Sequence, residues 1–192
     1  RAVHWTFDPM RGANARLNLE KLGAVVREFT LDKYGSLSSA LYGEVPSDRF
    51  TADWDLLAPA TAQRLRQVAD CTYQAPTLEE THRIPRLTLD TLPDILRDPP
   101  PRISYEIPGD IDALMRDDPA AAIAWRQEMR QVLARVLTTK AATMPDAATT
   151  DPLSISIATG PGGYLVNGIA TGLDESGERQ SLYRLERLAG RD

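Results

Sequence analysis

The feature that most constrains this chain is a strand, a helix and a second strand that follow one another at its N-terminus. Residues 2–7 (AVHWTF) alternate along the chain and are rich in aromatic and β-branched side chains, which predicts a strand. Residues 10–22 carry apolar side chains at helical spacing, and Gly23 follows where a left-handed residue would end the helix. Residues 24–31 (AVVREFTL) predict the second strand. This unit organises the N-terminal part of the chain.

The rest of the N-terminal part adds one strand and one short helix. Residues 49–57 alternate again and predict a third strand, and residues 60–68 predict the helix. Residues 70–101 have weak periodicity and end in three consecutive prolines, which neither a helix nor a central strand tolerates. We therefore expect one unit over residues 1–69 and a linker or irregular segment over residues 70–101.

A second structured block is expected over residues 102–192. It opens with a strand at residues 103–107, and Asp110 is placed to cap a short helix. Asp118 is followed by proline, which is the pattern of a helix start, and that helix is expected to run to about Leu137.

The C-terminal end of this block predicts a hairpin. Residues 138–163 are rich in Ala, Thr, Pro and Gly and predict an insertion without regular structure. Residues 164–171 and 181–188 predict two strands joined by a turn. The fold class is therefore predicted as α/β in the α+β sense, a mixed sheet flanked by helices with a C-terminal strand, helix and hairpin extension.

Composition limits the classes of function. The chain has 22 Lys and Arg against 27 Asp and Glu, and its net charge of −5 gives no overall attraction to nucleic acid or an anionic membrane. The single cysteine, Cys71, excludes an intramolecular disulfide, and no His or Cys cluster has metal-site spacing. No apolar run reaches the roughly 18 residues that span a bilayer, and no signal peptide opens the chain. We expect a cytoplasmic protein without a bound metal.

A resemblance to a known family runs through the strand, helix and strand of the N-terminal unit. Residues 5–29 (WTFDPMRGANARLNLEKLGAVVREF) resemble the second half of the GNAT acyltransferase fold, where a strand leads into a helix with the pattern N-x-x-A-x-x-x-Y-x-K-x-G-F. Four further runs are similar to a group of GNAT acyltransferases of largely unassigned substrate: Tyr34-Gly35, Pro46–Arg49, Trp125–Arg130 and Gly163–Gly168. The resemblance covers residues 3–57 closely, and residues 102–137 and 163–188 more loosely.

The resemblance implies a CoA-dependent N-acyltransferase that moves an acetyl or succinyl group from an acyl-CoA to a small amine such as an amino acid. This reaction needs an amine held beside the thioester carbonyl, a path for its proton and groups that orient the pantetheine amides. Asn14 and Asn18 are the expected cofactor contacts, because they lie four residues apart on one predicted helical face and an amide both donates and accepts. Trp5, in the same run, is an expected substrate contact.

Two catalytic roles follow from the same resemblance. The family's usual acid for the leaving thiolate is a helix tyrosine, and Leu19 stands at that position here. Tyr34, just after the second strand, is the predicted replacement, with a half-buried packing role as the alternative. Asp8 and His4 flank the first strand as candidate bases for the amine, and an exposed surface position is the alternative for His4.

Arginines supply the candidate anion sites. Arg49 is the second predicted substrate contact, because its guanidinium can bind both oxygens of a carboxylate on the acceptor or the acyl group. The alternative is an ion pair with Asp48 or Asp53. Arg126 and Arg130 lie four residues apart and form either a second anion site or a solvated helix face.

One element of the family pattern is not found. The loop Q/R-x-x-G-x-G/A, whose backbone N–H groups hold the CoA pyrophosphate, does not occur in the sequence, and Arg1 leads directly into strand-like residues. We therefore expect this chain alone to bind CoA poorly and to be inactive, and a missing N-terminal half, or a second copy of the chain, to complete the site. The alternative, from a different class, is a non-catalytic GNAT-like interaction domain. Leu19 and the missing loop favour that alternative, whereas Asn14 and Asn18 favour the enzyme.

Overall fold

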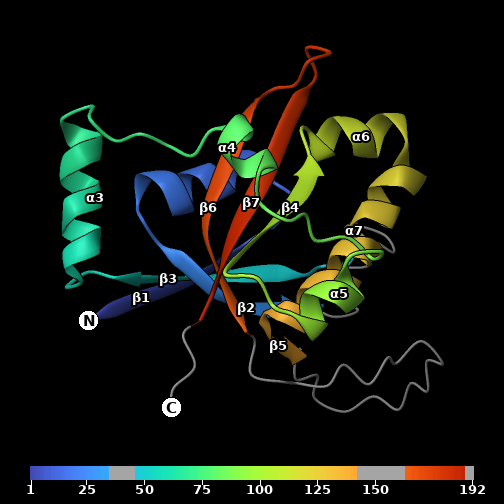
Figure 1. The fold of residues 1–192 in the computed structure, drawn as a ribbon, viewed down its shortest axis with the longest axis horizontal. Coiled ribbons are helices and arrows are strands. Elements are labelled where there is room, and N and C mark those ends of the chain that lie inside the picture. Colours follow the sequence, from blue (N-terminus) through green and yellow to red (C-terminus); the bar gives the residue numbers. More distant parts are fainter. Residues whose placement is uncertain (35–45, 142–162, 189–192) are drawn as a thin grey trace.

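Seven β-strands form one sheet in the computed structural model of this 192-residue chain, which describes residues 1–34, 46–141 and 163–188 (Figure 1). The strands are β1 (Ala2–Phe7), β2 (Val25–Leu31), β3 (Arg49–Asp55), β4 (Arg102–Pro108), β5 (Thr138–Ala141), β6 (Tyr164–Leu173) and β7 (Arg179–Arg187). Their order across the sheet is β1-β3-β2-β6-β7-β4, and β5 lies beside β2. The β2–β5 pair is parallel and the others are antiparallel, so the sheet is mixed and the predicted α+β class is confirmed.

Helices pack against this sheet. They are α1 (Gly12–Ala15), the π-helix η1 (Arg16–Lys21), α3 (Pro59–Ala69), α4 (Leu78–His82), α5 (Leu92–Arg97), α6 (Ile111–Asp117) and α7 (Pro119–Val136). The long α7 contacts β2 and β5, whereas α1 and η1 contact β6. Within the described ranges no helix combines the length and the apolar character that crossing a membrane requires.

Side-chain caps start the two helices that follow β4, as the sequence predicts. The Asp110 carboxylate accepts hydrogen bonds from the backbone N–H groups of Asp112 and Ala113, and so begins α6. The Asp118 carboxylate accepts from Ala121 N–H at 3.0 Å, and Pro119 follows as the first residue of α7. These caps fix where α6 and α7 begin, and these two helices face the end of β1.

The helix between β1 and β2 differs from the prediction over residues 10–22. It begins at Gly12, and its second half is wound as a π-helix in which Leu22 N–H donates to Leu17 O. Gly23 ends it with φ +71°, as the sequence predicts. The wider π-helical turn changes which side chains share a face of the helix.

We expect Gly23→Ala to lower the free energy of unfolding by about 1 kcal/mol, because a side chain at this positive φ is strained. The added Cβ would also lie 3.0 Å from Arg64 Cγ. Urea denaturation measures the loss. Gly163→Ala is the matched control, since nothing lies within 4 Å of its new Cβ, and equal stability of the two variants would contradict the prediction.

The segment 70–101 is more structured than its weak periodicity indicates. It contains α4 and α5, and it buries Thr81, Leu87 and Ile95. Leu87 N–H donates to Ser104 O at 2.7 Å, so the segment runs beside β4 at the edge of the sheet. Each helix has five or six residues, too few turns to give a clear helical pattern in the sequence.

The sheet and the core are continuous from the N-terminal unit to the C-terminal block. Val26 of β2 pairs with Val166 of β6, and residues 138–141, predicted as part of an insertion, form β5 beside β2. The remainder of that insertion, residues 142–162, lies outside the described residues. The predicted hairpin is confirmed in β6 and β7, which are both longer than expected.

Aromatic rings from both parts meet in one cluster. Phe50 of β3 contacts Phe7, Phe29 and Tyr183 edge to face, with ring centroids 5.8, 5.6 and 5.4 Å apart respectively. The buried Tyr183 hydroxyl donates to Pro9 O at 2.7 Å. The C-terminal strand β7 therefore helps to fix the turn that follows β1.

Candidate functional site

A cavity of about 550 Å³ opens where β1 ends, and four of the six predicted site residues line it. Asp8 follows β1, Asn14 belongs to α1, Tyr34 follows β2 and Arg49 begins β3. The opposite wall comes from α6 and α7. Helix α7 contributes Arg126, and α6 contributes Ile111, Asp112 and Met115, which were not singled out from the sequence. The cavity thus gathers side chains from the N-terminal unit and the C-terminal block.

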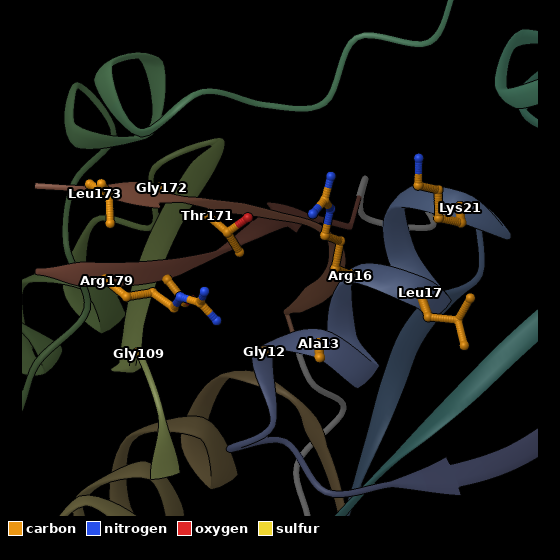
Figure 2. A pocket seen from close by; sticks show the side chains of 11 residues that line it. Gly12, Ala13, Arg16, Leu17, Lys21, Gly109, Thr171, Gly172, Leu173 and Arg179 are labelled. Carbon is orange, nitrogen blue, oxygen red and sulfur yellow. The ribbon is translucent and has the colours of Figure 1, made fainter. Parts of the chain in front are cut away.

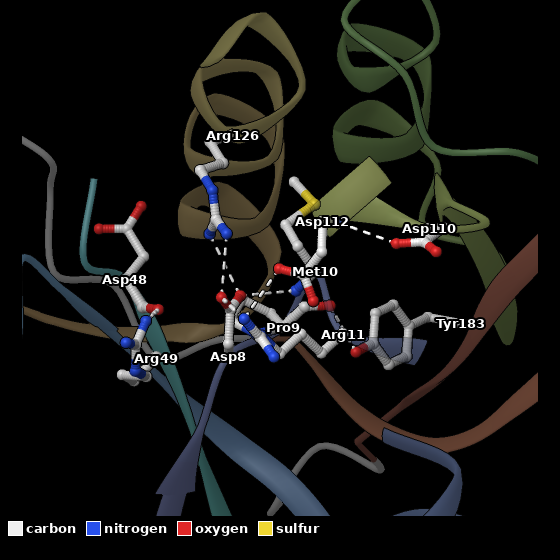
Figure 3. A network of polar contacts seen from close by, with 10 residues as sticks. All are labelled: Asp8, Pro9, Met10, Arg11, Asp48, Arg49, Asp110, Asp112, Arg126 and Tyr183. Atoms are coloured by element: carbon white, nitrogen blue, oxygen red, sulfur yellow. Dashed lines mark hydrogen bonds and ion pairs between the residues drawn. The ribbon is translucent and has the colours of Figure 1, made fainter. Parts of the chain in front are cut away.

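Asp8 and Arg126 form a paired contact at the base of this cavity (Figure 3). Two guanidinium nitrogens of Arg126 donate to the two carboxylate oxygens of Asp8, at 3.1 and 2.9 Å, and Met10 N–H donates to the same carboxylate at 2.9 Å. Burial alone would raise the pKa of Asp8, but the hydrogen bonds and charge of Arg126, the Met10 N–H and the charge of Arg49 outweigh it and lower that pKa.

This contact determines what Asp8 can do. A carboxylate with a lowered pKa and both oxygens bound is a weak proton acceptor. The geometry therefore disfavours Asp8 as the base for an amine and favours it as the residue that holds α7 against the end of β1. The other candidate base, His4, is exposed on β1, 3.8 Å from Asp53 and outside the cavity lining.

Arg49 is the cavity cation that forms no ion pair among the described residues, although its charge helps to lower the pKa of Asp8. It donates to the backbone O of Asp48 at 2.8 Å, and its guanidinium carbon lies 5.1 Å from the centre of the Tyr34 ring. The alternative of an ion pair is not found, because the Asp48 carboxylate binds Arg130 and Asp53 lies beside His4 and Arg27. Arg49 is therefore held in position with donor groups to spare.

Tyr34 is half exposed, and its ring lies against the Arg49 guanidinium. Its backbone N–H donates to Ser47 Oγ at 3.2 Å, which ties the end of β2 to the start of β3. Its hydroxyl has no hydrogen-bond partner among residues 1–34, 46–141 and 163–188. The ring thus supports Arg49 while its hydroxyl stays open.

The two predicted cofactor contacts, Asn14 and Asn18, lie in different environments. Asn14 is exposed and lines the cavity, whereas Asn18 is 4% exposed and its Oδ1 accepts a hydrogen bond from Trp5 Nε1 at 3.2 Å. Trp5 packs edge to face on Trp54 and does not line the cavity, and neither does Asn18. The chain changes from α- to π-helix at Arg16, between the two asparagines, so the α-helical spacing behind the prediction does not hold.

The predicted second anion site is occupied by the protein itself. Arg126 binds Asp8, and Arg130 donates to Asp48 at 2.6 and 2.9 Å and to Asp32 at 2.8 Å. Burial would lower the pKa of Arg130, but the hydrogen bonds and charges of Asp48 and then Asp32 outweigh it and raise that pKa. Both guanidinium groups therefore form ion pairs that hold α7 against the segments beside the cavity.

Sequence reasoning missed how α6 and α7 contribute to the site. Arg126 and Asp8 are 118 residues apart, and helical spacing gives no signal for such a pair. Arg11 and Asp112, which also line the cavity, form a 2.8 Å ion pair between α6 and the turn after β1. The caps at Asp110 and Asp118 predict where the two helices begin. They do not predict which residues the helices face.

No group of three or more His, Cys, Asp or Glu side chains suited to a metal ion occurs in the part of the chain that the structure describes. Besides its ion-paired side chains, the cavity lining includes the Arg49 guanidinium, the Asn14 amide and the Tyr34 phenol. Such a set can bind a carboxylate and hydrogen-bond to a neutral acyl group. Comparison of the chain with protein-family models, with curated proteins and with solved structures finds no match.

Proposed function

We propose that this chain is part of a CoA-dependent N-acyltransferase and that the cavity at the end of β1 holds the acyl group and the acceptor amine. The observation that carries the proposal is Arg49, a cation that forms no ion pair among the described residues, in one cavity with Asn14 and Tyr34. Its open donors suit the free carboxylate of a dicarboxylic acyl group such as succinyl.

The remaining residues fit defined steps. Asn14 can donate to and accept from a pantetheine amide, which would orient the thioester. The amine nitrogen attacks the thioester carbonyl carbon, the carbon–sulfur bond breaks, and the Tyr34 hydroxyl gives its proton to the leaving sulfur. Water in the open cavity takes the proton of the amine, since Asp8 is bound by Arg126.

The edge of the sheet supports the expectation that the site is completed from elsewhere. Among the described residues β1 pairs with β3 alone, so its other edge leaves backbone N–H and C=O groups open. That edge leads directly to Asp8 and the cavity. A further polypeptide segment or a second copy of the chain would add a strand there. The loop for the CoA pyrophosphate would have to come from a segment of different sequence, because this sequence contains no such loop.

Calorimetric titration with acetyl-CoA and succinyl-CoA tests the proposal, on protein in which the polypeptide that completes the CoA site is present. We expect saturable binding of both thioesters, and Arg49→Gln should weaken succinyl-CoA by about tenfold with little effect on acetyl-CoA, because one charge-assisted pair is lost. Arg135→Gln, an exposed charge on α7 outside the cavity lining, is the matched control. Equal weakening of both thioesters, or none, would contradict the assigned role of Arg49.

A second candidate function is a non-catalytic interaction domain. Two contacts favour it, because Asn18 is occupied by Trp5 and Asp8 by Arg126, so neither serves a reaction as it stands. This candidate predicts no heat with either thioester. That result would replace the enzyme proposal.

A further inference from the structure

A second cavity, of about 650 Å³, lies between α1 and η1 on one side and the β6–β7 hairpin on the other (Figure 2). It shares no lining residue with the first cavity. The short helix separates the two, since Asn14 and Arg11 line the first whereas Gly12, Ala13 and Arg16 line the second. It is therefore a separate site, to which the acyltransferase proposal assigns nothing.

The charges of this cavity are all positive. Arg16, Lys21 and Arg179 line it, and its lining contains no Asp or Glu. None of the three cations forms an ion pair or a side-chain hydrogen bond within the described parts of the chain. Figure 2 shows Arg179 reaching from β7 toward α1, with Arg16 on the facing wall. Three cations without an ion pair around one cavity, in a chain of net charge −5, favour an anion in the space between them.

The Ser181 hydroxyl adds a second observation. The residue as a whole is 2% exposed and lines the cavity, and its hydroxyl has no hydrogen-bond partner in the described residues. A hydroxyl that opens onto the cavity can donate to or accept from an oxygen of a bound ligand. Gly12 keeps the hydroxyl accessible, because a Cβ on Gly12 would lie 3.2 Å from Ser181 Oγ.

Apolar side chains form the rest of the walls. Leu17 is 54% and Leu173 68% exposed, unusually open positions for leucine, and they lie at opposite ends of the cavity (Figure 2). An anion without an apolar part would leave these side chains in water. The lining is therefore suited to a ligand that has both a charged head and a hydrocarbon body.

We propose that this cavity binds an oxyanion that carries an apolar chain, with the head between Arg16 and Arg179, near Ser181, and the chain toward Leu173 at one end of the cavity. A carboxylate and a phosphate monoester share this chemistry. The inference does not depend on the acyltransferase proposal, because it uses other residues on the other side of α1.

Calorimetry with octyl phosphate and sodium octanoate tests the proposal and distinguishes the two heads. Inorganic phosphate supplies the head alone and octanol the chain alone. We expect the better of the two amphiphiles to bind about tenfold or more tightly than either fragment, since both parts contribute. Octanol binding as tightly as the amphiphiles, or no saturable binding of either amphiphile, would overturn the proposal.

Variants locate the binding. Arg16→Gln with Arg179→Gln should weaken the better amphiphile by about tenfold or more, whereas Arg135→Gln on α7 should leave it unchanged. Gly12→Ala, which crowds Ser181 without removing a charge, should weaken it as well. Thermal melting confirms that each variant is folded.

The same titration separates this site from the first cavity. Arg49→Gln should bind the amphiphile normally even if it fails to bind succinyl-CoA, because Arg49 lies outside the second cavity. Equal affinities of the double variant and the Arg135→Gln control would show that the two arginines do not hold the ligand, and would end the assignment.

Discussion

Replacing Arg126 with glutamine should lower the free energy of unfolding by about 3–5 kcal/mol near neutral pH, because it leaves the Asp8 carboxylate without its charge partner. Asp8 and Arg126 are both largely buried, so water replaces the lost contact poorly. Urea denaturation measures the loss. Arg135→Gln removes an exposed charge from the same helix and should have little effect.

The pH dependence of this loss has a defined sign. The pKa of Asp8 is lowered in the folded protein, so its stabilising contribution is present above the ordinary carboxyl pKa and is lost as pH falls through the folded value. In the Arg126 variant burial is no longer opposed by that guanidinium, and the pKa of Asp8 should rise. The stability gap between the two proteins should therefore narrow as the pH falls from about 7 to about 4.

The double variant Asp8→Asn/Arg126→Gln is the control for this mechanism. It removes both charges, so it should be more stable near neutral pH than the single Arg126 variant. A single variant whose deficit does not change with pH, or a double variant that is less stable than the single one, would contradict the role assigned to the pair.

Glu20→Ala is expected to cost about 3 kcal/mol of unfolding free energy, because it leaves the buried Ile169 N–H and the partly buried Tyr73 hydroxyl without their acceptor. Glu20 is 2% exposed, accepts from Ile169 N–H of β6 at 2.7 Å, and also accepts from the Tyr73 hydroxyl. Burial and then the hydrogen bond and charge of Glu20 raise the pKa of Tyr73, so this phenol stays protonated as the donor. Arg64 stands 3.9 Å from the carboxylate.

Two measurements check the role of Glu20. Urea denaturation gives the stability, with Glu175→Ala as control because Glu175 is exposed in the β6–β7 turn. Hydrogen exchange reports the Ile169 amide, which should lose protection in Glu20→Ala and keep more of it in Glu20→Gln, where the Oε1 acceptor remains. Unchanged protection of Ile169 in Glu20→Ala would contradict the assigned contact.

The sequence predicted well what depends on neighbouring residues. The alternation in residues 2–7, the caps at Asp110 and Asp118 and the glycine at position 23 are local signals, and each corresponds to a feature of the structure. The antiparallel pairing of β1 with β3, which no local signal specifies, brings Asp8 close to Arg49 in the cavity.

The sequence could not predict contacts that depend on distant residues or on an irregular helix. Asn18 has the same side chain as Asn14, and the tryptophan that binds it comes from a strand packed against the helix. The Asp8–Arg126 pair requires the placement of α7 over the end of β1, which no spacing within either segment specifies. The function assigned to the first cavity remains a proposal that the thioester titration decides.

Strand β2 divides one of its edges between two partners. Along that edge Val26 meets β6, while residues 28–31 run beside β5, and β3 occupies the other edge. A polypeptide cut between α3 and β4 would therefore lose everything along that side of β2, as well as the Tyr183 ring under Phe50. The two parts of the chain cannot be exchanged as modules, and they should melt together in a single cooperative transition.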